Sequence, residues 1–160
     1  MKAFKISEKI YLDHSVSEVW ETVSSKNALE LYHPFCLKND LIEHEKKDSL
    51  IYLNGLNYIR EFTAWTPNQG FELFIGKKNG KQSKVIWELK PIYNGCEISI
   101  TIFPYRSDKI NKLLYPFVNF FMIKPKLKKY LQSVLNGLKY HLDHKLKVEK
   151  NQFGKHPWFS

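Results

Sequence analysis

The sequence has few cysteines, glycines and prolines, and it has no long apolar run. Its 160 residues include two Cys, seven Gly and seven Pro, which excludes a disulfide scaffold and argues against a linker or a low-complexity segment. The longest apolar run, 113–123, is eleven residues long, so it is too short to cross a bilayer. Residues 1–5 lack the apolar core of a signal peptide. We therefore expect a soluble, cytoplasmic protein in which Cys36 and Cys96 are reduced and structural.

Common motifs of catalysis and cofactor binding are also missing. The sequence has no Walker loop, no dinucleotide fingerprint, no nucleophile elbow and no HExxH. His141 and His144 share a predicted helix face, but no third ligand stands at a suitable spacing. We therefore expect neither a cofactor nor a metal ion.

The composition fits one folded domain with a charge concentrated near its end. Hydrophobic residues make up 43% of the chain, which excludes disorder, and there are 4 Trp, 9 Tyr and 11 Phe. Residues 1–104 carry 13 basic and 13 acidic side chains, whereas residues 105–160 carry 12 basic and 3 acidic ones, so the net charge of +9 lies in the last third. Few of the basic residues are arginines and no base-reading motif accompanies them, so we expect no nucleic-acid partner.

Hydrophobic periodicity predicts the order of the elements. Apolar and polar side chains alternate over residues 4–12, which predicts a half-buried strand. Ser15 with Glu18 forms a capping box before a short helix. A second short helix begins at Asn27 and ends near His33, because Pro34 disfavours helical backbone before it. Regular turn signals divide 39–105 into six strands, and Ser107 with Asp108 is a plausible N-cap. A stripe at helical spacing then predicts a long final helix whose apolar face consists of Leu127, Tyr130, Leu131, Val134, Leu135, Leu138 and Leu142. Pro116 and Pro125 should break or kink the segment before it.

Turn geometry predicts which side chains of the six strands share a face. A two-residue loop at Asn94-Gly95 pairs Trp87 with Ile102, and a three-residue loop at 78–80 pairs Leu73 with Val85. The turn at 67–70 pairs Phe62 with Ile75, and a two-residue loop at Asn54-Gly55 pairs Ile51 with Tyr58. These four hairpins agree on one apolar face, so we predict a single curled sheet closed by the last helix.

A strand followed by a capped helix with a Trp is predicted from Phe4-Lys5-Ile6 and Ser15-Val16-Ser17-Glu18-Val19-Trp20. The last hairpin is predicted from Trp87-Glu88-Leu89-Lys90-Pro91 and Asn94-Gly95-Cys96-Glu97-Ile98-Ser99-Ile100. In these motifs and in the order of its elements, the sequence resembles the START-like (SRPBCC) superfamily. The resemblance covers about residues 2–147, leaving 148–160 as an irregular tail. It implies an α+β helix-grip fold: a seven-stranded antiparallel sheet curled around a long C-terminal helix, with two short helices after the first strand. Polyketide cyclase-like proteins, plant allergen-type carriers and lipid-transfer domains share this fold, which implies a cavity for an apolar or amphipathic molecule but no universal catalytic set.

A polar group is predicted on the inner face of the sheet. A two-residue turn at Lys47-Asp48 brings His44 to the same side as Tyr58 and Arg60. A buried Arg needs a partner, which a ligand carboxylate or phosphate supplies, and His44 with Tyr58 suits a general base with a hydrogen-bond donor. The alternatives are that Arg60 pairs with Glu8 or Glu61, and that a three-residue loop turns His44 outward.

The run 113–123 stands beside a lysine-rich stretch, and three interpretations of it remain open. In the first interpretation, the run covers the cavity entrance as a gate. In the second, residues 113–129 dock on an anionic membrane. In the third, the run forms a dimer interface. The chain is therefore a monomer or a dimer.

The leading functional hypothesis is non-enzymatic binding or transport of a hydrophobic or amphipathic small molecule in a cavity between the sheet and the C-terminal helix. The alternatives are a cyclase or dehydratase that uses His44, Tyr58 and Arg60, and a membrane-docking lipid or quinone chaperone. The residues predicted to contact the ligand are Tyr58, Arg60, Phe62, Phe71, Trp87, Phe117 and Phe121.

Overall fold

Seven strands form one antiparallel sheet in the computed structural model, which describes residues 3–160. Their order across the sheet is β1-β7-β6-β5-β4-β3-β2, so each strand from β2 to β7 lies beside its neighbour in the chain, and β1 closes the far edge. The predicted α+β architecture with seven strands is confirmed. The strands are β1 (Ile6–Leu12), β2 (Cys36–Glu43), β3 (Lys47–Tyr52), β4 (Asn57–Thr66), β5 (Gly70–Gly76), β6 (Gln82–Ile92) and β7 (Gly95–Phe103).

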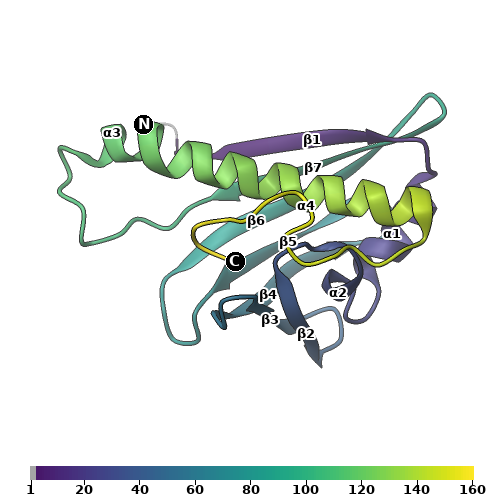
Figure 1. Ribbon diagram of the computed structural model, residues 1–160, viewed down its shortest axis with the longest axis horizontal. Helices are drawn as coiled ribbons and strands as arrows, with labels where there is room; N and C mark the ends of the chain where they lie inside the picture. The colour runs from purple at the N-terminus through teal and green to yellow at the C-terminus, as the bar shows by residue number, and fades with distance from the viewer. Residues whose placement is uncertain (1–2) are drawn as a thin grey trace.

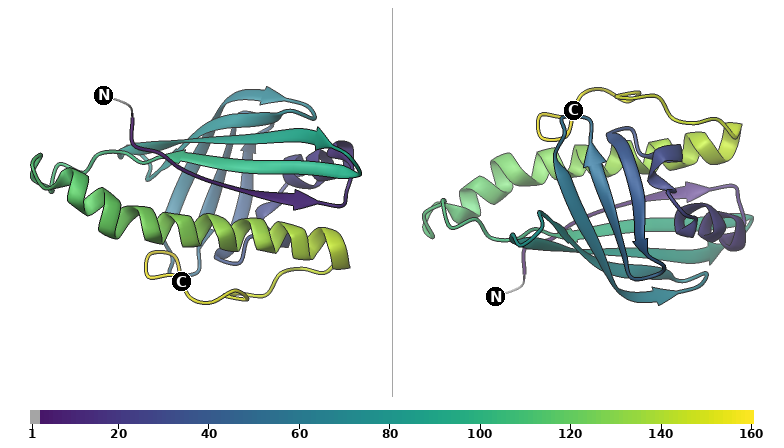
Figure 2. Two further views of the ribbon diagram at one scale, coloured as in Figure 1. Left: turned by 90° about the horizontal axis from the view of Figure 1, so that it is seen from above. Right: turned by 90° about the horizontal axis from the view of Figure 1, so that it is seen from below.

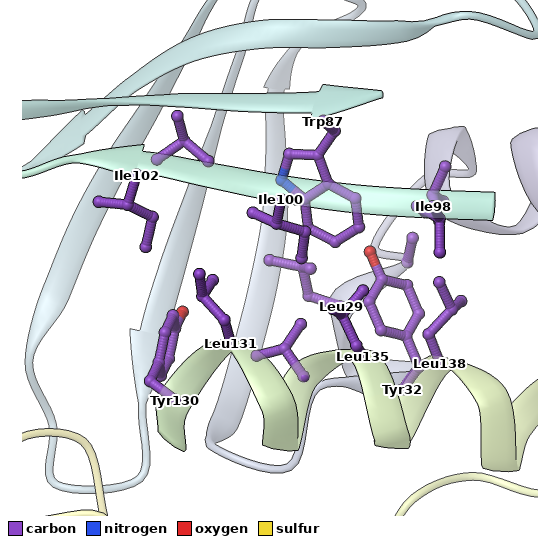
Figure 3. Packing of buried hydrophobic residues seen from close by; sticks show 14 of the residues in the cluster. Leu29, Tyr32, Trp87, Ile98, Ile100, Ile102, Tyr130, Leu131, Leu135 and Leu138 are labelled. Atoms are coloured by element: carbon purple, nitrogen blue, oxygen red, sulfur yellow. The ribbon is translucent and has the colours of Figure 1, made fainter. Parts of the chain in front are cut away.

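The long helix α4 (Lys124–His144) lies along the concave face of the sheet, as Figures 1 and 2 show. Its predicted apolar stripe faces the strands: Leu131, Leu135 and Leu138 are almost fully buried. Figure 3 shows these leucines directed at the sheet, where Trp87, Ile98 and Ile100 lie. The helix thus supplies one wall of the core and the sheet supplies the other.

Two short helices, α1 (Val16–Ser24) and α2 (Leu29–Tyr32), cover one end of this layer (Figure 1). The capping residue is confirmed, since the Glu18 backbone N–H donates to Ser15 Oγ over 3.1 Å. The Glu18 carboxylate instead contacts His14 Nδ1 and Lys145 Nζ. This contact ties the start of α1 to the end of α4.

A glycine sets how closely α4 approaches α2. A Cβ placed on Gly137 would lie 2.0 Å from the Tyr32 carbonyl oxygen, which is backbone and cannot swing aside. Only glycine allows this approach, so the sequence fixes the distance between the two helices here.

The segment 115–123, just before α4, is helical although Pro116 and Pro125 predict a break or kink there. Helix α3 (Tyr115–Val118) continues through a π-helical turn, η1 (Asn119–Ile123), directly into α4. Of the break or kink predicted at Pro125, the break does not occur, because the wider turn just before it accommodates the missing N–H. The predicted cap at Ser107 is wrong: no helix begins between Ser107 and Leu114.

The predicted register is partly correct. Leu73 pairs with Val85 as expected. Trp87 pairs with Ile100 rather than Ile102, a shift of two residues that leaves the same side chains on the inner face. A β-bulge after Phe62 pairs it with Leu73 instead of Ile75, which again preserves its face.

The register of the β3–β4 hairpin is shifted by one residue from the predicted register. This shift changes which side chains of β3 point to the inner face of the sheet. Tyr52 N–H donates to the Leu56 carbonyl, so the loop is the three residues 53–55, with Gly55 at φ +84°. Tyr58 consequently pairs with Leu50 rather than Ile51. Because the side-chain period of a strand is two, the shift turns Leu50 and Tyr52 inward, where both are 1% exposed.

The C-terminal segment 145–160 has no helix or strand, and it packs against the fold. Figure 2 shows it running back along α4. Val148 N–H donates to the Leu31 carbonyl, and the Phe159 ring stacks on Tyr52 with centroids 4.3 Å apart. The segment is thereby part of the closed core.

No helix within residues 3–160 is long and apolar enough to cross a membrane. The cytoplasmic location stays a prediction. Both cysteines are buried and unpaired, and burial raises the pKa of the Cys36 thiol to about 12. That thiol is therefore protonated and unreactive at neutral pH.

Candidate functional site

A cavity of about 460 Å³ lies between the sheet and α4. Protein interiors contain few voids larger than a water molecule, so a cavity of this size is not an ordinary packing defect. Its volume lies in the range of ligand-binding pockets. Most of its lining is apolar and comes from β3 to β7, from α4 and from the segment before it. Its apolar lining includes Leu50, Leu73, Ile75, Val85, Trp87, Ile100, Ile102, Val118, Met122, Ile123, Leu127, Leu131, Val134 and Phe159.

Polar side chains line a smaller part of the wall. Three of them form one hydrogen-bonded row: His33 Nε2 lies 2.9 Å from Tyr130 Oη, which lies 3.1 Å from Tyr52 Oη. Tyr130 projects from α4 toward the sheet, with its hydroxyl at the far end (Figure 3). The row thus joins the residue that ends α2 to α4 and β3 within the cavity wall.

Burial sets the protonation of this row. It lowers the pKa of His33 to about 3, with a further contribution from the nearby Arg60 charge, and it raises the pKa of Tyr52 and of Tyr130 above the ordinary value. The imidazole and both phenols are therefore neutral at physiological pH.

Arg60 also lines the cavity, but its charge already has a partner. Asp48 lies opposite Arg60 across β3 and β4 and accepts hydrogen bonds from Nε (2.7 Å) and Nη2 (2.5 Å). Neither Glu8 nor Glu61 is that partner: Glu8 lies near Gln132 and Lys128, and Glu61 near Lys47. The one-residue shift of β3 brings Asp48 to this position.

The predicted position of His44 is wrong. The β2–β3 connection is a three-residue turn, 44–46, with Glu45 at φ +57° and Glu43 paired with Lys47. His44 sits in the turn itself, and its side chain is 79% exposed. It lies outside the main cavity, so it cannot act on a molecule bound there together with Tyr58.

The structure brings three of the seven predicted contact residues to the cavity wall, namely Tyr58, Arg60 and Trp87. Phe62 and Phe71 instead pack in an aromatic cluster with Trp65. Phe117 and Phe121 contact each other and are about 60% exposed. Neither lines the cavity, although Val118, Met122 and Ile123 of the same segment do.

Sequence reasoning missed His33, Tyr52 and the C-terminal aromatics. A three-residue loop at 53–55 would have placed Tyr52 inward with Leu50. Tyr130 was found, but only as part of the apolar stripe. Nothing in the local pattern around Trp158 and Phe159 indicates that they return to the cavity, because that depends on the path of the chain after α4.

A surface patch adjoins the cavity at the α3 end. It consists of apolar side chains that are half or more exposed: Leu113, Leu114, Phe117, Phe120, Phe121 and Met122. Lys124 Nζ lies 5.4 Å from the centre of the Phe120 ring, and Arg106 lies over the Tyr115 ring. This apolar patch is therefore flanked by positive charge.

Among residues 3–160 no group of three His, Cys, Asp or Glu side chains is arranged to hold a metal ion. Of the two histidines that share a face of α4, His141 makes a hydrogen bond from Nδ1 to the Leu146 carbonyl oxygen. The other, His144, packs against the ring of Tyr140.

No protein-family model and no curated protein matches the sequence. Solved structures do share the fold. DynU16, a protein in the dynemicin biosynthetic locus, has a TM-score of 0.70 and 14% identity over 92% of this chain and 50% of that chain. This chain thus spans half the length of DynU16. A protein of unknown function from Staphylococcus aureus has a TM-score of 0.73 and 10% identity, covering 90% and 96%. CalU16 from Micromonospora echinospora has a TM-score of 0.62 and 12% identity, covering 89% and 78%. These likenesses show the helix-grip fold.

Proposed function

We propose that the protein binds a small apolar or amphipathic molecule in the cavity between the sheet and α4. The observation that carries this proposal is a cavity of about 460 Å³ with a mostly apolar wall. Ligand sites in proteins have this size and character. DynU16, which has the same fold, is a protein in a biosynthetic locus, which is consistent with small-molecule binding.

Binding is better supported than catalysis by the polar residues at hand. A general base works best when its pKa lies near the operating pH. His44 lies outside the cavity, and the pKa of His33 is lowered to about 3. The His33 ring is therefore suited to hold a hydrogen bond rather than to accept a proton during turnover.

Filling the cavity from α4 tests the proposal. Val134 is buried and lines the cavity, so Val134→Phe should weaken binding of the neutral fluorescent probe N-phenyl-1-naphthylamine at least tenfold. Asn136→Phe adds a ring to the exposed side of the same helix and should leave the affinity unchanged. Native mass spectrometry of the protein purified from cells should also show a bound small molecule. Wild-type protein that takes up no probe, or a probe affinity that Val134→Phe leaves unchanged, would contradict cavity binding.

The apolar patch supports a second proposal, that the α3 end docks on an anionic membrane and exchanges ligand there. Six exposed apolar side chains with neighbouring cations suit insertion of aromatic rings while lysines meet lipid headgroups. The same segment contributes Val118, Met122 and Ile123 to the cavity wall. Docking would therefore place the cavity next to the bilayer.

Sedimentation with vesicles tests the docking proposal. The protein should bind phosphatidylglycerol-containing vesicles but not pure phosphatidylcholine, and 0.5 M salt should weaken the binding. Phe117→Ser with Phe121→Ser should abolish binding. Tyr93→Ser is the matched control, because Tyr93 is an exposed aromatic in the β6–β7 turn, at the opposite end of the molecule. Equal binding by both variants, or a salt-insensitive dimer in place of vesicle binding, would exclude docking through this patch.

A further inference from the structure

The row of His33, Tyr130 and Tyr52 has a defined direction. The Phe35 backbone N–H donates to His33 Nδ1 over 3.2 Å, so Nδ1 carries a lone pair. The buried ring is neutral, and its one hydrogen is therefore on Nε2. That hydrogen is donated to Tyr130 Oη, 2.9 Å away.

The row contains one more hydrogen than it has hydrogen bonds between its three members. His33 Nε2, Tyr130 Oη and Tyr52 Oη carry three hydrogens, but only two contacts join the three groups. Neither hydroxyl has another hydrogen-bond partner among residues 3–160. One hydroxyl hydrogen is thus left without an acceptor inside a mainly apolar cavity. Since a hydroxyl that accepts a hydrogen bond becomes a better donor, the favoured order is His33 to Tyr130 to Tyr52, with the free hydrogen on Tyr52.

The charges around the cavity limit what can accept this hydrogen. Among residues 3–160, no Asp, Glu or Lys belongs to the lining, and the one fully charged lining residue in that part of the chain, Arg60, is paired with Asp48. An anionic group would be buried beside a pair that is already neutral, at a large desolvation cost. An uncharged acceptor oxygen has no such cost, because the free hydroxyl satisfies it.

We propose that Tyr52 donates a hydrogen bond to a neutral carbonyl oxygen on an otherwise apolar ligand, such as a ketone, ester or quinone. This inference rests on the proposed function and adds the chemical class of the ligand. Tyr130 and His33 act as positioning residues that orient the Tyr52 hydroxyl.

A pair of matched probes separates this inference from the proposal of cavity binding. The probes are 2-acetonaphthone and 2-isopropenylnaphthalene, in which a C=CH₂ group replaces the C=O group with nearly the same shape. Their affinities are measured for wild type, for Tyr52→Phe, and for Tyr140→Phe as a control on α4 outside the cavity lining. The Tyr52→Phe variant should lose about 3- to 10-fold in affinity for the ketone, which corresponds to one hydrogen bond, and nothing for the alkene. Tyr140→Phe should bind both probes as wild type does.

Infrared spectra of the carbonyl-¹³C-labelled ketone give a second, direct readout on the wild-type protein. The C=O stretch of the bound ketone should lie below its value in hexane, and Tyr52→Phe should return it toward that value. An unshifted stretch in wild type, or a Tyr52→Phe effect that is equal for ketone and alkene, overturns the hydrogen-bond inference while leaving cavity binding intact. If neither probe binds wild type, the proposal of cavity binding fails as well.

Discussion

Asp48 lies directly opposite Arg60 across β3 and β4, and its carboxylate accepts two hydrogen bonds from the guanidinium inside the protein. About nine-tenths of each side chain is removed from solvent. A buried ion pair of this kind is costly to break from one side only, because the remaining charge is left without a partner. The pair therefore holds β3 in the register that turns Tyr52 toward the cavity.

Removing one partner of this pair should destabilise the protein strongly. We expect Asp48→Asn to lower the free energy of unfolding by about 3–5 kcal/mol. The double variant Asp48→Leu with Arg60→Met removes both charges and should be clearly more stable than Asp48→Asn. Urea denaturation of the three proteins checks this. Equal stability of the single and double variants would show that the pair does not act as a unit.

The His33 site predicts a dependence of stability on pH. The pKa of His33 is lowered to about 3 in the folded protein, whereas an unfolded histidine titrates near 6.5, so the unfolded chain takes up the proton first as the pH falls. The contribution of His33 is complete above about pH 6.5 and decreases toward pH 3. Between pH 7 and pH 5, wild type should lose about 2 kcal/mol more than His33→Gln. Parallel losses in the two proteins would place His33 in contact with water.

The sequence predicts the fold well because its signals are redundant. The capping box at Ser15, the turns at regular spacing and the stripe around Leu131 and Leu135 independently predict the first helix, the strands and the last helix, and together they give the order of elements of the helix-grip fold. An error of two residues, as at Trp87, leaves the faces unchanged. Strand order and core composition therefore survive errors in individual turns.

The candidate site is less predictable than the fold, because an error of one residue in the register of a strand changes which of its side chains line the cavity. Reading Asn54-Gly55 as a two-residue loop puts Ile51 inward, whereas the three-residue loop puts Asp48 and Tyr52 there instead. The same kind of difference moves His44 from the inner face to an exposed turn. Both alternatives satisfy local turn chemistry, and only packing against the rest of the protein decides between them.

The C-terminal segment should contribute to stability through one aromatic contact. Phe159 is 7% exposed and stacks on Tyr52 while also contacting Tyr130. Phe159→Ala should lower the free energy of unfolding by about 3 kcal/mol and should speed release of N-phenyl-1-naphthylamine, because the cavity loses part of its wall. Leu146→Ala removes an exposed side chain from the same segment and should have little effect. Similar stabilities of the two variants, measured by urea denaturation, would show that the contacts of Phe159 with Tyr52 and Tyr130 do not stabilise the fold.

A methyl group at Gly137 should be destabilising although it lies within a helix. Alanine is favoured over glycine in a helix by about 1 kcal/mol, but here the added Cβ would meet the Tyr32 backbone. We expect Gly137→Ala to lower the melting temperature, and Asn136→Ala, on the exposed side of the same turn, to raise it slightly or leave it unchanged. A stabilised Gly137→Ala protein would mean that α4 lies farther from α2.

The central claim is that a ligand occupies the space between the sheet and α4, and methyl NMR tests it most directly. On titration with 2-acetonaphthone, the ¹H–¹³C signals of cavity methyl groups, such as those of Val85, Ile100 and Val134, should shift and saturate together. The methyl groups of Val19 and Val23, buried on α1 and outside the cavity lining, should not move. Shifts that follow this division would support binding in the cavity. Shifts confined to the exposed surface, or the absence of any saturable shift, would contradict it.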